Sequence, residues 1–219
     1  MFEATHLIGF GADAASAVPS YSYRTHAEDF TDLTTYTFAS QDIGTASATR
    51  YVVVTVFGRH TAAFTFSSVT VAGVSATSVV EQANAGSRLG IFIAAVPSGT
   101  TGNVVVTASG GIVRCGIGVY ALYDLSSSTA ITTNSSTASP AALSVNVTPG
   151  KILIAAAYTN GGSGNQLTWS GATEDFDVNL EVGTSSSASL LTSTTETPRT
   201  VTGAYGTASV QVAVSALFG

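Results

Sequence analysis

Charged residues are scarce in this chain, where Asp, Glu, Lys and Arg together make up 9% of 219 residues. Ordinary soluble domains carry roughly 25%. Ser and Thr are abundant instead, so we predict a neutral surface rich in hydroxyl groups. Because few charges need desolvation when such a surface is covered, the composition favours a chain that packs against copies of itself or against other proteins.

Basic residues are fewer still: there are seven, they stand singly along the chain, and the net charge is −6. A surface that binds nucleic acid needs clustered Lys and Arg to displace the counterions of the phosphates. We therefore predict no nucleic-acid partner.

Long hydrophobic runs are also missing, since none approaches the roughly 18 residues that a membrane helix needs. We predict no membrane partner. The opening stretch "MFEATHLIGFGADAAS" has no basic segment and carries Glu3, so it does not have the pattern of a signal peptide. We expect the protein to fold in a cytoplasm.

Cysteine occurs once, as Cys115. A single cysteine excludes an intramolecular disulfide and a zinc site built on cysteines. Cys115 keeps step with Val113 and Ile117 in the segment "VRCGIGVYALY", and we expect it to be a small buried residue.

Enzyme signatures are absent from the sequence. It contains no G-x-S-x-G elbow, no P-loop, no G-x-G-x-x-G before a helix and no H-E-x-x-H. The three histidines, His6, His26 and His60, lie far apart. We therefore expect no enzymatic activity and no cofactor.

Short β-branched segments separated by Gly, Ser, Thr and Asn fill the chain, and helical periodicity is nearly absent. Turn signals such as "PSGTTGN" fit hairpins or sandwich corners. The pattern predicts an all-β antiparallel sandwich. The expected strands are 33–39, 51–57, 67–72, 77–81, 88–96, 102–108, 112–123, 141–147, 151–158, 166–170, 174–182, 187–193, 199–205 and 208–218.

The two series of strands resemble each other, which favours a duplicated β-unit. The segment "RYVVVTVFG" (50–58) matches "KILIAAAYT" (151–159), "TVAG" (70–73) matches "TWSG" (168–171), and "VYALY" (119–123) matches "VSALF" (214–218). The three matches occur in the same order and at nearly one spacing.

Two assemblies of the halves are open. They could be two tandem sandwiches joined by residues 124–140, or one jelly-roll-like sandwich in which each half supplies strands to both sheets. We favour one domain over 28–219, with possible halves 28–123 and 141–219.

The run "RYVVVTVFG" is apolar on both faces, so it needs cover on both sides. We expect Val52, Val54 and Val56 to face one layer and Val53 and Phe57 to face the other, because side chains alternate along a strand.

Residues 1–27 differ from the rest of the chain. We predict an extended docking arm with apolar anchors at Phe2, Leu7, Ile8 and Phe10 and a tyrosine pair at Tyr21 and Tyr23. The alternative is a terminal strand of the sandwich.

The stretch "EDFDVNLEV" (174–182) is the most ordered polar pattern. In a strand, Asp175, Asp177, Asn179 and Glu181 would share one face. Such an acidic stripe could bind Ca²⁺, but calcium ligands usually converge from a loop, so we favour a solvent-exposed face. Trp169 could stack on a sugar, but shares a face with Leu167, which favours core packing.

Six segments share an architectural pattern that carries no chemistry: "TTYTFASQDIG", "ATRYVVVTVFG", "SVTVAGVSATSVV", "RLGIFIAAVPSGTTGNVVVTASGGIVRCGIGVYAL", "LTWSGATEDFD" and "VAVSALFG". Together they resemble virion structural proteins of tailed bacteriophages. The resemblance covers roughly residues 33–219. It implies a β-sandwich on a phage particle, associated with the head or the tail.

From these observations we expect a structural virion protein, assembled in the host cytoplasm, that decorates the capsid, forms a head fibre or belongs to a tail appendage. Its expected partners are other virion proteins and further copies of itself, in a homo-oligomer. The alternative is a carbohydrate-binding adhesin that contacts a glycan on the host surface, because sandwiches commonly host such sites.

Overall fold

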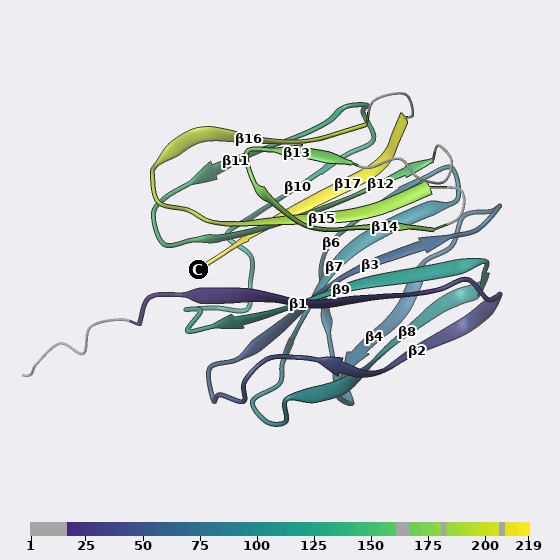
Figure 1. The fold of residues 1–219 in the computed structure, drawn as a ribbon, viewed down its shortest axis with the longest axis horizontal. Coiled ribbons are helices and arrows are strands. Elements are labelled where there is room, and N and C mark those ends of the chain that lie inside the picture. The colour runs from purple at the N-terminus through teal and green to yellow at the C-terminus, as the bar shows by residue number, and fades with distance from the viewer. Residues whose placement is uncertain (1–16, 161–166, 181–182, 206–208) are drawn as a thin grey trace, which may run out of the picture.

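The computed structural model describes residues 17–160, 167–180, 183–205 and 209–219. Its strands form four antiparallel sheets, stacked in two β-sandwiches (Figure 1). The prediction of an all-β antiparallel sandwich fold is confirmed. None of the described residues belongs to a helix that could cross a membrane.

The first sandwich is built from residues 20–123. Its inner sheet has the order β1 (Ser20–Asp29), β9 (Arg114–Tyr123), β3 (Tyr51–Arg59), β7 (Ser87–Ala95) and β6 (Thr77–Asn84). Its outer sheet has the order β2 (Leu33–Asp42), β8 (Thr101–Ile112), β4 (Phe66–Val71) and β5 (Val74–Ser75).

The second sandwich is built from residues 132–218. Its inner sheet has the order β10 (Thr132–Ser136), β17 (Ser209–Phe218), β12 (Ile152–Asn160), β15 (Gly183–Leu191) and β14 (Thr173–Asn179). Its outer sheet has the order β11 (Ala141–Val147), β16 (Glu196–Ala204) and β13 (Thr168–Ser170).

The two sandwiches have the same strand order. When the strands of each half are numbered along the chain, both inner sheets and both outer sheets match position by position, and β5 is an addition in the first half. The turns after the matched segments "TVAG" and "TWSG" agree as well, because Gly73 and Gly171 both have a positive φ, 81° and 82°. This one-to-one topology supports the predicted duplication.

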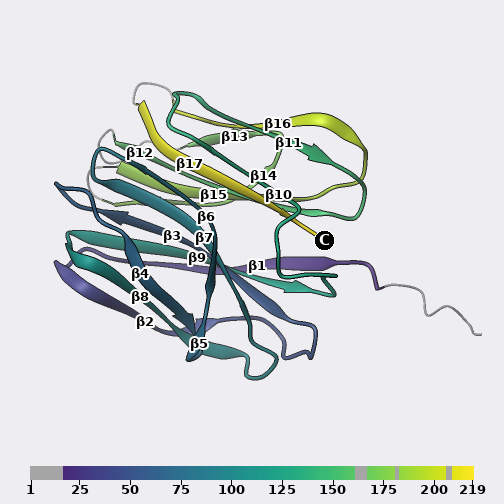
Figure 2. The same ribbon diagram turned by 180° about the vertical axis from the view of Figure 1, so that it is seen from behind.

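The four sheets enclose three hydrophobic cores in a row, and Figure 2 shows the same layers from behind. One core lies inside each sandwich. The third lies between the two inner sheets and joins the sandwiches. Both inner sheets are therefore covered on both faces.

Strand β3 shows the double burial directly. Val52, Val54 and Val56 lie in the core of the first sandwich, whereas Val53 and Phe57 lie in the core between the sandwiches. This orientation is the one predicted from the alternation of the strand.

Strand β12 is its counterpart in the second sandwich. Ile152 and Ile154 face the core between the sandwiches, and Leu153, Ala155 and Ala157 face the core of the second sandwich. The two apolar runs are thus a matched pair of central strands.

The preference for one jelly-roll-like sandwich over 28–219 is corrected by the topology. Each sheet draws its strands from one half of the chain only, so the halves are two sandwiches packed face to face. A sheet buried on both faces satisfies the same apolar pattern in either arrangement, and the pattern could not separate them.

The boundary of the predicted arm is also corrected. Residues 20–27 belong to β1, which pairs along its length with β9 as an edge strand of the inner sheet. The polar spacing of "SYSYRTHAED" reflects an edge strand that is half-exposed. Phe2, Leu7, Ile8 and Phe10 lie outside the described residues.

Most edge strands are irregular. The pairings of β1, β2, β6, β11 and β14 each contain a shift in register. The remaining edge strands, β5, β10 and β13, have five residues or fewer. Bulges and short edges hinder pairing with a strand of another chain, so association by edge-to-edge pairing is disfavoured.

Arg50 explains the base that precedes the apolar run of β3. Its side chain is 1% exposed and donates to the carbonyl oxygens of Val96 (2.7 Å), Gly44 (2.6 Å) and Ser98 (2.7 Å). The guanidinium therefore fastens the segment before β3 to the segment after β7.

We expect Arg50→Met to lower the free energy of unfolding by about 3 kcal/mol, because three carbonyl groups lose their donors and two of these hydrogen bonds are buried. The matched control is Arg24→Met, which breaks the part-exposed ion pair with Asp42 and should cost at most about 1 kcal/mol. Urea unfolding measures both, and equal costs for the two variants would contradict the account.

Candidate functional site

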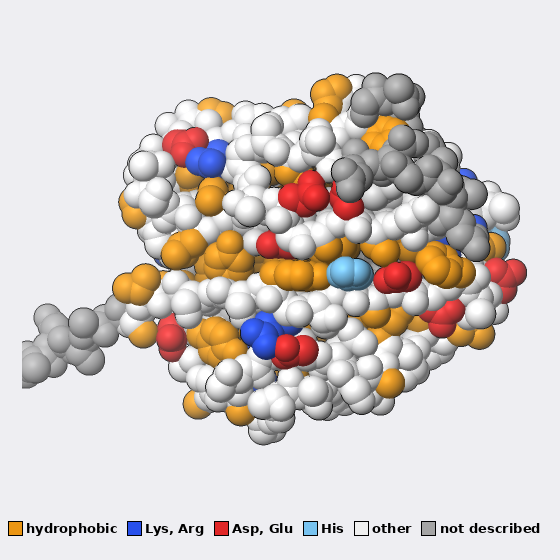
Figure 3. Space-filling model, in the orientation of Figure 1, with side chains coloured by type: hydrophobic (Ala, Val, Ile, Leu, Met, Phe, Trp, Pro, Cys, Tyr) orange, Lys and Arg blue, Asp and Glu red, His pale blue; other side chains and the backbone are white. Residues whose placement is uncertain are grey.

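The two leads from the sequence, the tyrosine pair and the acidic strand, meet where the edge strands β1 and β14 approach each other. We call this line between the sandwiches the seam, and define it by Tyr21, Tyr23, His26, Asp175 and Phe176. Figure 3 shows hydrophobic side chains and a histidine gathered along it.

A bulge in β1 places the aromatic residues on one side. The register shifts between Tyr23 and Thr25, so that Tyr23 is opposite Tyr120 and His26 is opposite Gly118. Because of this extra residue, Tyr21, Tyr23 and His26 all face the second sandwich. Arg24, at the bulge, bonds to Asp42 instead.

A bulge in β14 separates the acidic residues. The register shifts between Glu174 and Phe176, and Asp175 is the extra residue. Asp175 points toward the first sandwich, whereas Asp177 pairs with Ser186 and points the other way. The predicted sharing of one face is therefore not what the structure has, and Glu181 lies outside the described residues.

Asp175 is held by hydroxyl groups from both sandwiches. Tyr120 donates to its Oδ2 at 2.8 Å, and Ser189 donates to its Oδ1 at 3.0 Å. The Ser189 hydroxyl also lies 3.1 Å from the hydroxyl of Tyr21, and Tyr120 lies 2.6 Å from Ser187. The carboxylate thus links β1, β9 and β15 across the seam.

A row of rings covers this carboxylate network. Phe176 stacks on Tyr23 and on His26, with ring centroids 5.7 Å and 5.0 Å apart. The Tyr23 hydroxyl and Nδ1 of His26 are 2.7 Å apart. Since the rings cover one another's faces, they do not form an open stacking platform.

Gly118 makes room for this contact. A Cβ atom at Gly118 would lie 2.5 Å from the ring of Phe176 and 2.8 Å from Oγ1 of Thr55. The glycine therefore lets β14 of the second sandwich pack directly on the sheet of the first.

Burial dominates the acid–base properties of the seam. It raises the pKa of Asp175, and the hydrogen bonds from Ser189 and Tyr120 offset part of that effect. Burial also raises the pKa of Tyr23 to about 12, with further contributions from Asp175 and Glu28. The phenol of Tyr23 is thus neutral, and Asp175 holds its proton more tightly than an exposed carboxyl group.

Asp177 lies on the other side of β14, inside the second sandwich. Both of its carboxyl oxygens are buried without a hydrogen bond of standard geometry, although the Ser186 hydroxyl and the Leu167 amide lie close enough to favour the charged form. Burial is the larger effect and raises its pKa. Among the described residues, no three His, Cys, Asp or Glu side chains are grouped to hold a metal ion.

The remaining candidates are part of the cores. Trp169 packs against the core of the second sandwich, and its Nε1 donates to Ser186 at 2.8 Å. Cys115 is fully buried, and its burial raises its pKa. Tyr21 and Tyr23 pack against the core between the sandwiches, so within this chain they serve the seam.

Sequence reasoning missed the serines of "GTSSSAS". Ser187 and Ser189 are buried in β15 and point at the seam. The available signal was Tyr120, because a buried tyrosine in an apolar strand needs a partner for its hydroxyl.

The outermost surfaces of the stack are its other distinctive feature. On the outer sheet of the first sandwich, the residues that alternate with the core are uncharged, and Oγ1 of Thr35 lies 3.3 Å from Oγ1 of Thr107. These residues are Thr35, Thr37, Ser68, Thr70, Asn103, Val105 and Thr107.

The outer sheet of the second sandwich has a surface similar to that of the first. The residues that alternate with its core are uncharged too: Ala142, Ser144, Asn146, Thr168, Ser170, Thr200 and Thr202. The ion pair of Glu196 and Arg199 lies at one end of β16. We call these two surfaces the outer faces. They lie at opposite ends of the stack, so one chain presents two hydroxyl-rich faces.

Comparisons with known proteins returned no relative. No family model, no curated protein and no solved structure matches the chain.

The raised pKa of Asp175 predicts a pH effect of definite sign. Between the ordinary pKa of a carboxyl group and the raised one, the folded chain binds more protons than the unfolded chain, so the contribution of Asp175 to stability falls as pH rises. Asp175→Asn should remove this fall. Urea unfolding between pH 4 and pH 7 measures it.

The control is Asp42→Asn, because hydrogen bonding to Arg24 lowers the pKa of Asp42. Its contribution to stability is present above the ordinary pKa and is lost as pH falls. The two variants should therefore tilt the pH profile of the wild type in opposite directions. If both variants tilted the pH profile of stability in the same direction, the opposite pKa shifts assigned to Asp175 and Asp42 would be contradicted.

Proposed function

We propose that this chain is a structural protein of a tailed-bacteriophage virion, a surface-exposed β-sandwich protein that acts by contact with other virion proteins. The observation that carries the proposal is the pair of uncharged outer faces at opposite ends of one stack of sheets. Covering such faces costs little desolvation, because they carry no charge that must lose its water.

The edges of the sheets support contact through faces. Bulged or short edge strands resist pairing with a neighbouring chain, whereas the outer faces present uncharged side chains, most of them Thr and Ser. A particle protein with this design packs beside its neighbours without forming a continuous intermolecular sheet.

One end of the stack suits attachment. Strand β1 begins at the same end as the C-terminus (Figure 1). Three apolar side chains at this end of the stack are exposed to solvent: Val18 is 71%, Ile131 53% and Leu191 43% exposed. We infer that residues 1–16, with Phe2, Leu7, Ile8 and Phe10, contribute the docking segment.

The test is the composition of purified phage particles that encode the chain. Mass spectrometry should find the chain in the particles, and its absence would overturn the proposal. The double variant Thr37→Lys, Thr107→Lys should lower incorporation at least about tenfold, because a contact would bury two unpaired ammonium groups.

The matched control is Ala48→Lys, which adds a charge in an exposed loop outside the outer faces. It should be incorporated like the wild type. All variants should keep the far-ultraviolet circular dichroism of the folded chain. Normal incorporation of the double variant would contradict contact through the outer face of the first sandwich.

A further inference from the structure

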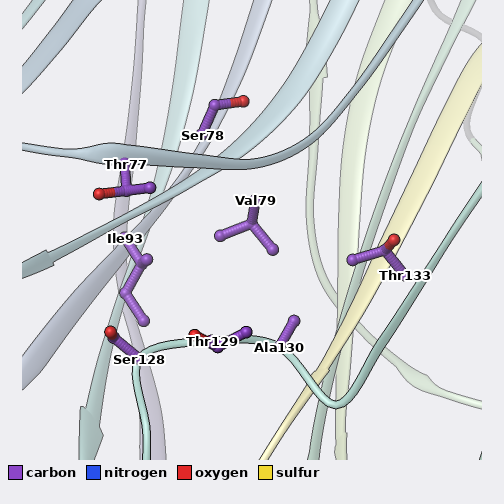
Figure 4. A pocket seen from close by; sticks show the side chains of 8 residues that line it. All are labelled: Thr77, Ser78, Val79, Ile93, Ser128, Thr129, Ala130 and Thr133. Carbon is purple, nitrogen blue, oxygen red and sulfur yellow. The ribbon is translucent and has the colours of Figure 1, made fainter.

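The opposite side of the stack from the seam contains a cavity of about 190 Å³. It lies where β6 and β7 of the first sandwich meet the connecting segment 124–131 and β10 of the second. Figure 4 shows Val79, Ile93 and Ala130 pointing into it. The other lining residues all carry hydroxyl groups: Thr77, Ser78, Ser128, Thr129 and Thr133.

The cavity is built from fixed elements. Strand β6 has a bulge between Ser78 and Val80, and the extra residue, Val79, is turned toward the cavity (Figure 4). The connecting segment is held by the amide of Ile131, which donates to the carbonyl of Leu217 at 2.7 Å, and by Ala130, which packs against the core between the sandwiches.

The lining has two chemical parts. Its floor is apolar, with Ile93 3% exposed and Val79 beside it. Its rim is formed by Thr77, Ser128 and Thr133, and no described residue hydrogen-bonds to the three hydroxyls that they carry. All eight lining residues are uncharged.

We propose that this cavity binds one pyranose ring of a neutral sugar. A pyranose presents a face of C–H groups, which fits the floor of Val79 and Ile93, and a rim of hydroxyls, which fits donors and acceptors such as Thr77, Ser128 and Thr133. The absence of charge in the lining favours a neutral ring over a uronic or sialic acid.

The size of the cavity limits the part of the ligand that it can enclose to a single ring. The cavity volume of about 190 Å³ lies below the roughly 300–1,000 Å³ of pockets that hold drug-sized ligands, which suits one hexose ring. A longer glycan has to place its other residues outside the cavity. With no aromatic side chain in the lining, affinity for one ring is weak, on the order of millimolar.

Ligand-observed NMR with the full chain tests the site. The probes are the methyl glycosides of glucose, galactose and N-acetylglucosamine, with methyl glucuronide as the charged comparison. At least one neutral glycoside should bind, and Ala130→Phe, which fills the cavity, should abolish the signal. The double variant Thr77→Val, Thr133→Val keeps the shape and should weaken binding roughly tenfold.

The matched control is Ala142→Phe, which adds the same ring on an outer face and should bind like the wild type. Two results would overturn the proposal: no neutral glycoside binds the wild type, so the hollow holds water only, or Ala130→Phe binds as well as the wild type. The inference is independent of the virion role, and Ala130→Phe should enter particles normally.

Discussion

The face-to-face packing of the two five-stranded sheets is the constraint on which the rest of the structure depends. Each inner sheet has one face in its own sandwich and the other in the shared core. Neither half can leave the other without exposing that core, which contains Val53, Phe57, Tyr120 and Tyr158. Both central strands must therefore be apolar on both faces, which few globular strands are.

The hydroxyl of Tyr120 in this interface is placed where it is satisfied, whereas the hydroxyl of Tyr158 has no hydrogen bond of standard geometry. Tyr120 carries the one hydroxyl of its strand into the shared core, and Asp175 and Ser187 lie within hydrogen-bond distance of it. A buried carboxyl group costs free energy unless it is hydrogen-bonded. The carboxyl group of Asp175 fixes how the second sandwich sits on the first, because its hydrogen-bond donors come from both sandwiches. Gly118 helps to fix the same arrangement, because the absence of a Cβ atom leaves room for the ring of Phe176.

Much of this fold could be predicted from residue patterns, because alternation and turn chemistry are local. The predicted strands overlap fourteen of the strands in the structure, and the facing of Val52 and Val53 followed from the period of two. The strands at 20–29 and 132–136 were missed or left open, since their polar sequences lack the apolar alternation.

The arrangement of the halves and the seam could not be predicted. One sandwich or two would bury "RYVVVTVFG" equally well, and the choice depends on contacts between distant strands. A bulge is a single extra residue whose effect is to change which side chain faces which sheet. At Arg24 it brings His26 beside Tyr23, and at Asp175 it separates two carboxyl groups that strict alternation places together. Residue patterns contain no signal for either.

The central claim is that the shared core makes the two sandwiches one cooperative unit. Trp169, the single tryptophan, reports on the second sandwich, while far-ultraviolet circular dichroism reports on all strands. Equilibrium unfolding in urea should give coincident transitions by the two probes, with the m-value of the whole chain. A tryptophan transition at a different midpoint from the circular dichroism would contradict the account, because it would mean that one sandwich stands without the other.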